Sequence, residues 1–388
     1  MTQNRYLHQP VIEDLKEKMV FLGGPRQVGK TTFATDIIGA HFKTAYFNWD
    51  KMAQRRQALR SEWPPESELI VLDEFHKHAK WKGWIKGEYD TRKKRYKFLF
   101  TGSARLDIYR RGGDSLQGRY HYYRLHPFSV SEMEQKKPEL KPFKKLVFDE
   151  KKISHFDTLF AFGGFPAPLI RQDSRHLRRW HTERLERFFR EDIRDLTAVQ
   201  DIGNLSLLAD LLQERSASLL SINSLAGDLQ VNFRTVSNWL NIFERLYFCF
   251  RLSPFQARTI ASVRKEKKLY LWDWSQILEE GNRLENVVAS HLLKFCHYLT
   301  DHDGWKAELF YLRDNTGREV DFLVCINRKP WFAVEVKTGR DPISRHLKYF
   351  QKKLKIPFCY QVQKRGENEY LKEDIHILPV SKFLTALV

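Results

Sequence analysis

The chain of 388 residues has four cysteines and no apolar run that approaches the ~18 residues of a membrane-spanning helix. Cys249, Cys296, Cys325 and Cys359 lie far apart and include no Cys-x-x-Cys pair. This spacing predicts neither a disulfide framework nor a cysteine zinc site, so we expect free thiols in a reducing compartment. The amino-terminal segment lacks the apolar core of a signal peptide, and we expect a cytoplasmic protein without a membrane partner.

Acidic residues are also scarce compared with basic ones. The chain has 66 Lys and Arg against 48 Asp and Glu, which gives a net charge of +18. Such an excess favours an anionic partner such as nucleic acid or an acidic membrane surface, with general solubility as the alternative. The length leaves room for two or three domains.

The segment 19–39 (MVFLGGPRQVGKTTFATDIIG) contains a glycine-rich turn between a predicted buried strand and a predicted amphipathic helix. The spacing Gly24-x-x-x-x-Gly29-Lys30-Thr31 is typical of a phosphate-binding loop, whose backbone N–H groups and helix N-terminus surround a polyphosphate. We expect Lys30 to reach the terminal phosphates and Thr31 to offer its hydroxyl to Mg²⁺. The expected nucleotide-binding residues are Gly24, Pro25, Arg26, Gln27, Val28, Gly29, Lys30, Thr31 and Thr32.

Two acidic residues end the third predicted strand of a parallel sheet. The segments 44–50 (TAYFNWD) and 68–74 (ELIVLDE) predict strands, and the second ends in Asp73 and Glu74. The carboxyl ends of parallel strands meet at the edge where the phosphate loop lies. We therefore expect Asp73 to hold Mg²⁺ through water and Glu74 to orient the attacking water, as in a nucleotide hydrolase. A solvated strand end is the alternative.

A fourth predicted strand, 95–105 (RYKFLFTGSAR), stops at the same edge and makes Ser103 the candidate γ-phosphate sensor. Arg119 precedes the alternating segment YHYYRL. It could neutralise transition-state charge, in its own subunit or in a neighbour, or it could pair with a surface acid. Arg105 is the rival for the catalytic role.

Five motifs together resemble a family of prokaryotic predicted AAA+ ATPases that carry a carboxyl-terminal domain of unknown function. They are GGPRQVGKTT (23–32), LIVLDEFHK (69–77), LFTGSAR (99–105), SLQGRYHYYRLHPFSVSE (115–132) and GGFP (163–166). The similarity extends over nearly the whole chain. It implies an AAA+ type parallel sheet with a helical lid, ATP as the nucleotide, and homo-oligomers whose shared active sites could take an arginine finger in trans.

The middle of the chain predicts two helical parts. Residues 151–200 mix arginines with acids, which favours a salt-bridged lid or connector. Residues 201–275 predict a winged-helix domain, because 221–255 has helix-turn-helix lengths and a basic loop lies between two strands. The alternatives are DNA contact and a spacer between proteins. The expected DNA-binding residues are Arg234, Ser237, Asn238, Arg264, Lys265, Lys267 and Lys268.

The last part of the chain predicts an amphipathic helix over 281–295 and a hairpin of strands 318–326 and 331–339. Glu285 lies at the margin of the helix, Asp321 lies on the first strand, and Glu335 and Lys337 share a face of the second. This order resembles the PD-(D/E)xK nuclease superfamily. The resemblance implies that Glu285, Asp321 and Glu335 hold Mg²⁺ and that Lys337 assists cleavage.

Taken together, the patterns predict an α/β chain of four parts. These are a P-loop AAA+ ATPase core (1–150), a helical lid or connector (151–200), a winged-helix domain (201–275) and a restriction-endonuclease-like domain (276–388). We expect an ATP-hydrolysing motor or switch that acts on DNA, with Mg²⁺-dependent cleavage left open. The alternative is a nucleotide-gated DNA- or protein-binding scaffold whose nuclease-fold domain does not cut.

Overall fold

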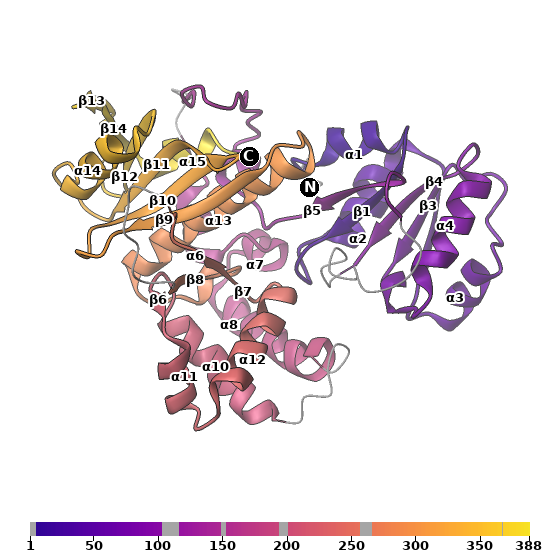
Figure 1. Ribbon diagram of the computed structural model, residues 1–388. Coiled ribbons are helices and arrows are strands. Elements are labelled where there is room, and N and C mark those ends of the chain that lie inside the picture. The colour runs from indigo at the N-terminus through magenta and orange to yellow at the C-terminus, as the bar shows by residue number, and fades with distance from the viewer. Residues whose placement is uncertain (1–4, 103–115, 149–152, 194–200, 257–265, 367) are drawn as a thin grey trace. The chain divides into compact units, whose positions relative to one another are not determined.

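The computed structural model describes residues 5–102, 116–148, 153–193, 201–256, 266–366 and 368–388 (Figure 1). The contacts within the chain divide it into two compact units, Met1–His126 and Pro127–Val388. The first unit therefore ends before residue 150, where the sequence placed the end of the ATPase core. In the parts of the chain that the structure describes, no helix has both the length and the apolar character needed to cross a membrane.

The first unit contains a five-stranded sheet in which every neighbouring pair is parallel. Its strands, in spatial order, are β2 (Thr44–Asn48), β3 (Leu69–Asp73), β4 (Lys97–Thr101), β1 (Met19–Gly23) and β5 (Tyr120–Arg124). All residues of β1 and β3 are buried, as expected for apolar strands covered on both faces. The parallel sheet and its helices fit the predicted P-loop α/β ATPase fold.

Short helices follow the strands of this sheet. They are α1 (His8–Asp14), α2 (Lys30–Thr32), η1 (Phe33–Ile38), η2 (Gly39–His41), α3 (Met52–Leu59), η3 (Phe75–Lys77) and α4 (Trp81–Arg92). The helix predicted after the glycine-rich turn is present, but it widens into a π-helix at η1. On one face of the sheet, Trp81 and Ile85 of α4 pack in an aromatic core with Phe21 and Phe98.

The second unit begins with helices in the region predicted as the lid. They are α5 (Val130–Met133), α6 (Phe156–Phe162), α7 (Pro166–Arg171), α8 (Ser174–Arg187) and η5 (Phe188–Asp192). All of them belong to the same compact unit as the rest of the chain to Val388. Their role as a lid stays a prediction.

Three helices and a small antiparallel sheet follow. They are α10 (Ile202–Glu214), β6 (Leu219–Leu220), α11 (Ile222–Asp228), α12 (Phe233–Arg245), β7 (Cys249–Leu252) and β8 (Lys267–Leu271), with the strands in the order β6-β8-β7. Val236, Leu240 and Phe243 of α12 are buried, as their helical spacing predicts. The helices and strands follow the order expected for residues 201–275, and the winged-helix assignment itself stays a prediction.

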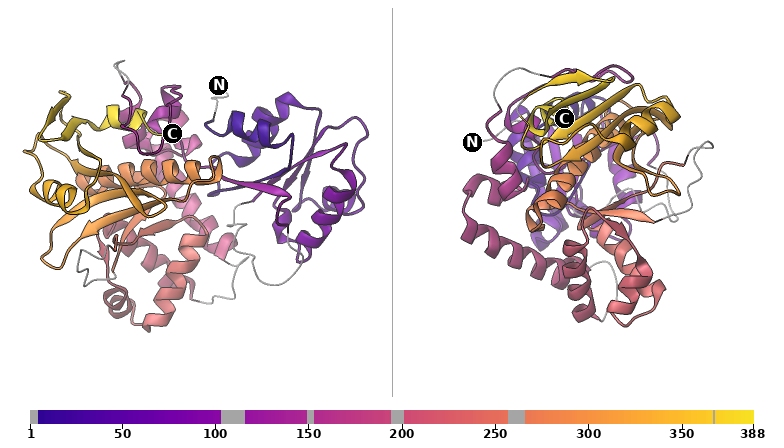
Figure 2. Two further views of the ribbon diagram at one scale, coloured as in Figure 1. Left: turned by 45° about the horizontal axis from the view of Figure 1, so that its top comes forward. Right: turned by 90° about the vertical axis from the view of Figure 1, so that its left-hand side faces the viewer.

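The remainder of the second unit is built on a six-stranded sheet, which Figure 2 shows from two further sides. Its strands, in spatial order, are β13 (Tyr370–Lys372), β14 (Ile375–Pro379), β12 (Phe358–Gln363), β11 (Lys329–Lys337), β10 (Glu319–Ile326) and β9 (Ala307–Arg313). Strands β9, β10 and β11 are antiparallel, whereas β11, β12 and β14 are parallel.

Helices cover both faces of this sheet. They are α13 (Glu280–Asp301), α14 (Arg345–Leu354) and α15 (Val380–Thr385), and the turn η6 (Trp274–Gln276) precedes α13. Phe295 of α13 contacts Phe332 of β11, whereas Phe350 of α14 packs on the opposite face near Ala333. The predicted helix and hairpin are therefore present.

The turn between β10 and β11 sets the register of the predicted hairpin. Asn327 and Arg328 have φ of 51° and 60°, which is the left-handed conformation of a tight two-residue turn. Lys329 pairs with Ile326 directly across this turn, and Phe322 pairs with Val334 farther along. This register brings the polar ends of both strands side by side.

Asp273 ties η6 to helix α8 and is 2% exposed. Its Oδ2 lies 3.1 Å from Nη1 of Arg184 and 3.4 Å from Nε2 of His181. Burial alone would raise the pKa of Asp273, but the hydrogen bond and charge of His181 and the charge of Arg184 lower it well below its usual value. The carboxylate therefore stabilises the fold in its ionised form.

We expect Asp273→Asn to lower the free energy of unfolding by about 3 kcal/mol at pH 7, because it removes the buried carboxylate that binds both Arg184 and His181. A depressed pKa contributes stability above the unfolded value of about 3.9 and loses it as the pH falls, so the difference should shrink below about pH 4. Urea unfolding at several pH values measures this. The exposed Asp210→Asn is the control, and an equal loss at all pH values would contradict the assignment.

Candidate functional site

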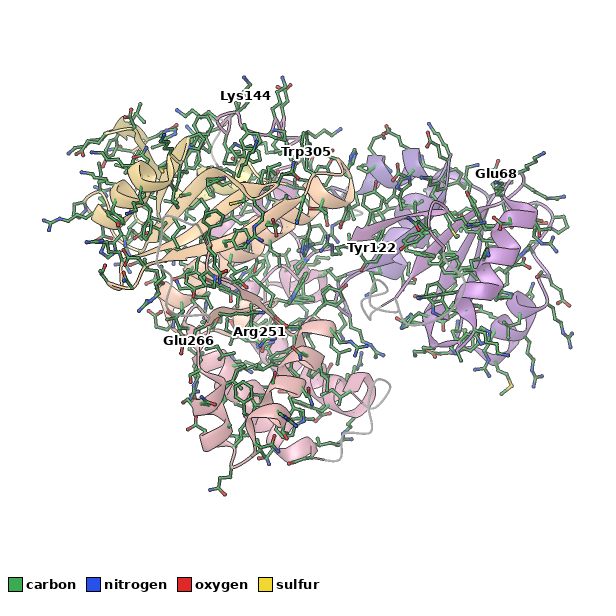
Figure 3. The ribbon with its side chains drawn as sticks, viewed as in Figure 1. Glu68, Tyr122, Lys144, Arg251, Glu266 and Trp305 are labelled. Carbon is green, nitrogen blue, oxygen red and sulfur yellow. The ribbon has the colours of Figure 1, made fainter. Side chains whose placement is uncertain are left out.

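The glycine-rich turn joins β1 to α2, and its backbone requires glycine at two positions. Gly24 has a φ of 145° and Gly29 a φ of 93°. A Cβ atom on Gly24 would collide with the carbonyl oxygen of Leu125, which follows β5. The neighbouring Gly23 faces the hydroxyl of Tyr122, which Figure 3 labels. The loop therefore packs closely against the end of β5.

The side chain of Lys30 lies inside this loop. Its ammonium donates to the carbonyl oxygens of Pro25 at 2.7 Å and Gly24 at 3.0 Å, and the residue is buried. Helix α2 begins at Lys30 itself, so the helix N-terminus and the cation are at the same place. Both favour an anionic group such as a phosphate.

Asp73 lies at the end of β3 and receives hydrogen bonds from neighbouring segments. Its Oδ2 accepts from the hydroxyl of Thr31 at 3.0 Å and from that of Tyr46 at 2.7 Å. Its Oδ1 accepts from the hydroxyl of Thr101, at the end of β4. The structure thus brings together Thr31 and Asp73, the two residues predicted to hold Mg²⁺, at one edge of the sheet.

Glu74 follows Asp73 in the left-handed conformation, with a φ of 59° that is uncommon outside glycine. Its N–H donates to the carbonyl oxygen of Thr101, and its Oε2 lies 3.5 Å from Nε2 of His76. Burial raises the pKa of the Glu74 carboxyl, against the opposing charge of Lys30. Burial also lowers the pKa of His76 to about 4, so this imidazole is neutral at pH 7.

Of the other residues predicted for catalysis in the first unit, the structure describes Arg119. Ser103 and Arg105 lie outside the described residues. The guanidinium of Arg119 binds Asp90 of α4, with Nε to Oδ1 at 2.8 Å and Nη2 to Oδ2 at 3.0 Å. Arg119 precedes β5 and therefore lies at the strand end opposite Gly23. The predicted catalytic role in its own subunit is corrected, because Arg119 forms a surface ion pair there. A role in a neighbouring subunit stays a prediction.

In the second unit the structure brings together the four residues of the predicted nuclease set. Asp321 Oδ2 accepts the N–H of Val336 at 2.9 Å, and Lys337 Nζ donates to Glu335 Oε1 at 2.8 Å. Glu285, from α13, accepts the hydroxyl of Tyr270 at 2.8 Å. We call Glu285, Glu319, Asp321 and Glu335 the carboxylate cluster.

Lys268 enters this cluster from β8, although the sequence predicted it as a DNA contact. Its ammonium lies 3.0 Å from Glu285 Oε1, 2.6 Å from Glu319 Oε1 and 3.5 Å from Asp321 Oδ1, and the residue is 3% exposed. Adjacent residues of a strand point to opposite faces, so Lys267 is exposed where Lys268 is buried. The prediction for Lys268 was therefore wrong.

Burial and mutual repulsion perturb the carboxylate cluster. Burial, followed by the charge of Asp321, raises the pKa of Glu285 and that of Glu335 to about 7 each. Burial alone would lower the pKa of Lys268, but Glu285, Asp321 and Glu319 raise it well above its usual value. Lys268 is therefore a permanent cation at neutral pH. Across the described segments, no three carboxylate, imidazole or thiol side chains converge as a metal site.

The predicted DNA contacts that the structure describes lie on α12 and β8. Arg234, Asn238 and Lys267 are exposed, and Ser237 is partly exposed. Arg264 and Lys265 lie outside the described residues. The side chain of Phe233, at the start of α12, is among the large exposed apolar groups, with 50% exposure.

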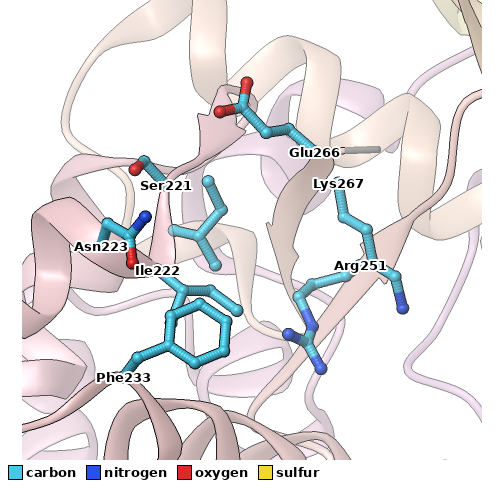
Figure 4. Close-up of a pocket in the computed structure, with 8 residues that line it drawn as sticks. Ser221, Ile222, Asn223, Phe233, Arg251, Glu266 and Lys267 are labelled. Carbon is cyan, nitrogen blue, oxygen red and sulfur yellow. The ribbon is translucent and has the colours of Figure 1, made fainter. Parts of the chain in front are cut away.

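A pocket of about 310 Å³ lies beside Phe233 (Figure 4). It is lined by Leu220, Ser221, Ile222, Asn223, Phe233, Arg251, Glu266 and Lys267. The guanidinium of Arg251 also binds Glu244 of α12, with Nε to Oε1 at 3.0 Å and Nη2 to Oε2 at 2.7 Å. The lining thus combines apolar side chains with two basic residues, Arg251 and Lys267, and one acid, Glu266.

Sequence reasoning missed several residues of both sites. Tyr46 and Thr101 hold Asp73, and Glu319 and Tyr270 belong to the carboxylate cluster or contact it. For Glu319 and Tyr270, the alternation of side chains along a strand is the signal that could have identified them. Glu319 shares a face with Asp321, and Tyr270 shares a face with Lys268.

Comparison with known family models finds matches to three segments of the chain. Residues 16–134 match the model of an AAA domain. Residues 153–277 and 280–383 match two domains of unknown function, DUF8612 and DUF4143. The AAA match supports a P-loop, AAA-like ATPase domain, and with it the predicted ATPase activity in general.

Similar full-length proteins are themselves uncharacterized. MJ1544 of Methanocaldococcus jannaschii is 22% identical over 89% of this chain and 80% of its own length. Rv2008c of Mycobacterium tuberculosis is 22% identical over 95% of this chain and 81% of its own length. Among solved structures, the Walker-type ATPase PABY2304 of Pyrococcus abyssi has a TM-score of 0.41 and 13% identity, covering 70% of this chain and 93% of that one.

We expect Gly24→Ala to destabilise the first unit by about 2 kcal/mol or more and to weaken nucleotide binding, because the methyl group collides with Leu125. The matched control is Gly87→Ala in α4, where a Cβ atom meets nothing within 4 Å. In a helix interior that change should stabilise by about 0.5–1 kcal/mol. Thermal unfolding and a fluorescent-nucleotide titration measure both. Equal behaviour of the two variants would contradict the close packing of the loop.

Proposed function

We propose that the chain hydrolyses ATP with Mg²⁺ in its first unit and uses the nucleotide to control nucleic-acid binding by its second unit. The observation that carries the first half is the convergence of Lys30, Thr31 and Asp73 at one edge of the parallel sheet. A cation inside a loop of backbone amides, next to a hydroxyl and a carboxylate, suits a nucleotide polyphosphate and its metal.

The residues present fit Mg²⁺. Thr31 Oγ1 and Asp73 Oδ2 are hard oxygen ligands 3.0 Å apart, at the start of α2 and the end of β3. Thr31 would bind the ion directly and Asp73 through water. A metal ion held there would neutralise charge on the phosphate oxygens. The hydroxyls of Tyr46 and Thr101 keep the Asp73 carboxylate oriented toward Thr31.

Glu74 would orient the attacking water. Its carboxylate lies beside the neutral imidazole of His76, and the charge of Lys30 acts on it. Its left-handed backbone directs the side chain away from the regular path of β3, a strain that is typical of functional positions. Lys30 and the loop amides would hold the β- and γ-phosphates during transfer.

A route for nucleotide control leads along the chain. Arg5 donates to the carbonyl oxygens of Val28, in the loop, and of His126, the last residue of the first unit. The chain then continues into Ser129, which accepts from Lys294 Nζ at 2.9 Å, so that this segment is held on α13. A change in the loop would therefore act on a segment that is anchored in the second unit.

The basic charge of the chain and the surface of α12 support nucleic acid as the partner, with DNA as our choice. Arg234, Ser237 and Asn238 are residue types that contact phosphates and base edges, and Lys267 lies on the neighbouring β8. The order of helices and strands in this region supports the predicted winged helix. A spacer between proteins would use the same fold without DNA. We do not extend the proposal to cleavage, because the ammonium of Lys268 lies within the carboxylate cluster.

The hydrolytic assignment is tested by two variants with different expected defects. Lys30→Ala removes a phosphate contact and should weaken ATP binding by at least about 30-fold. Glu74→Gln should keep ATP affinity and lower kcat by about 10²-fold or more, because only the water-orienting group is lost. Equilibrium binding and phosphate release measure these, with the exposed Lys94→Ala as the control. Hydrolysis at the parental rate by Glu74→Gln would refute the role of Glu74.

The partner is tested by the salt dependence of DNA binding. We expect affinity for a duplex to fall steeply with salt concentration and to change between the ATP and ADP states. The double change of Arg234 and Lys267 to Ala should reduce the slope of log affinity against log salt by up to about 2, or about 0.9 for each phosphate that the protein no longer neutralises. A matched double change of the exposed Lys94 and Lys352 to Ala should leave it unaltered. An equal slope in both double variants would place the DNA elsewhere.

A further inference from the structure

The carboxylate cluster surrounds a cation of the same chain, the ammonium of Lys268. The ammonium of Lys268 lies within 3.5 Å of oxygens from three carboxylates, those of Glu285, Glu319 and Asp321. These come from α13 and β10, whereas Lys268 comes from β8. With 3% exposure, the lysine is shielded from solvent in this position. A buried ammonium remains charged there because several acidic oxygens surround it.

Other hydrogen bonds in the cluster use the oxygens that a divalent cation would need. Glu285 Oε1 also accepts from Tyr270, Asp321 Oδ2 accepts from the backbone of Val336, and Glu335 Oε1 accepts from Lys337. Glu335 Oε2 is buried without a hydrogen-bond partner among the described residues. One such oxygen does not make a site for Mg²⁺, which takes about six oxygen ligands. The residues therefore do not fit the metal that the nuclease-like pattern implies.

The same cluster joins two parts of the second unit. Lys268 and Tyr270 lie on β8 of the three-stranded sheet, and both contact Glu285 of α13. The next residue of α13, Asn286, exchanges two hydrogen bonds of 2.8 Å with the backbone of Leu271, also on β8. The ion pair of Glu285 with Lys268 and the hydrogen bonds of Asn286 with Leu271 thus lie at adjacent positions of α13, and together they hold β8 on this helix.

We propose that the ammonium of Lys268 occupies the position that a divalent cation would take in the carboxylate cluster, and that the cluster joins β8 to α13 and β10. The second unit therefore binds no catalytic metal there. The role of the cluster is to position β8, whose opposite face carries the exposed Lys267 next to the pocket of Figure 4. A divalent cation could enter only by displacing Lys268 and releasing the strand. The proposal concerns the second unit and does not depend on ATP hydrolysis in the first.

The test measures Mn²⁺ binding to the full chain by electron paramagnetic resonance, in the absence of nucleotide. We expect the parental protein and its Asp321→Asn variant to bind Mn²⁺ equally, because the cluster takes no metal. Lys268→Met keeps the length of the side chain and removes its charge. We expect it to gain a Mn²⁺ site at least about tenfold tighter than any in the parental chain, and to lose that site when Asp321→Asn is added.

The matched control is Lys267→Met, which removes the same charge from the adjacent, exposed position and should bind Mn²⁺ like the parental chain. Thermal unfolding supplies a second measurement. We expect Lys268→Met to unfold at a lower temperature than Lys267→Met in chelator, and added Mn²⁺ to restore part of the difference. The parental protein and Lys267→Met should respond to Mn²⁺ equally, and less than Lys268→Met does.

Two results would overturn the proposal. One is Mn²⁺ binding by the parental chain that Asp321→Asn abolishes, with or without DNA cleavage, and this comparison decides the question even if Lys268→Met fails to fold. The other is a folded Lys268→Met variant that gains no Mn²⁺ site. ATP hydrolysis measured on the same preparations separates failure of this proposal from failure of the nucleotide assignment, since the variants leave the phosphate loop unchanged.

Discussion

The parallel pairing of the five strands in the first unit determines where its polar groups meet. Strands β3, β4 and β1 lie side by side, and all end at the same edge. That edge receives Thr31 from the helix after β1, Asp73 from β3 and Thr101 from β4, although these residues are distant in sequence. The buried carboxylate is tolerated there because hydroxyl groups satisfy both of its oxygens. A shift in any one pairing would separate the loop from the acid.

The second unit also brings acidic groups close together, but it compensates their charge with a lysine of the chain itself. Its carboxylates would repel one another at close range, and a cation must compensate them. In the first unit the chain leaves a hydroxyl and a carboxylate able to share an external ion. In the second, Lys268 supplies the charge internally and ties β8 to α13 and β10. An apparently catalytic set of acids thus becomes part of the packing, and the position of β8 depends on it.

Much of both units could be predicted because the patterns are local. The glycine-rich turn, the buried strands β1 and β3, the α12 core residues and the hairpin at Asn327 follow from periodicity and turn chemistry. The nearness of Asp321, Glu335 and Lys337 also followed from strand alternation. Lys268 was misplaced because a basic run was taken as one exposed loop, whereas β8 begins at Lys267 and turns the next residue inward. Arg119 was assigned a catalytic role by its motif, and the register of β5 with β1 shows that it lies at the strand end opposite Gly23, where it pairs with Asp90.

The sequence by itself determined the phosphate loop and the acidic end of β3, because each depends on residues that are close along the chain. It also determined which residue types line the second site. Only the tertiary structure decided what those residues do together. Tyr46 and Thr101 orient Asp73, and Lys268 compensates the charge of the carboxylate cluster. These contacts join different strands and helices, and no local pattern specifies them. The physical reason is that the charge of a buried group is decided by its neighbours in space, and those neighbours come from segments brought together by packing.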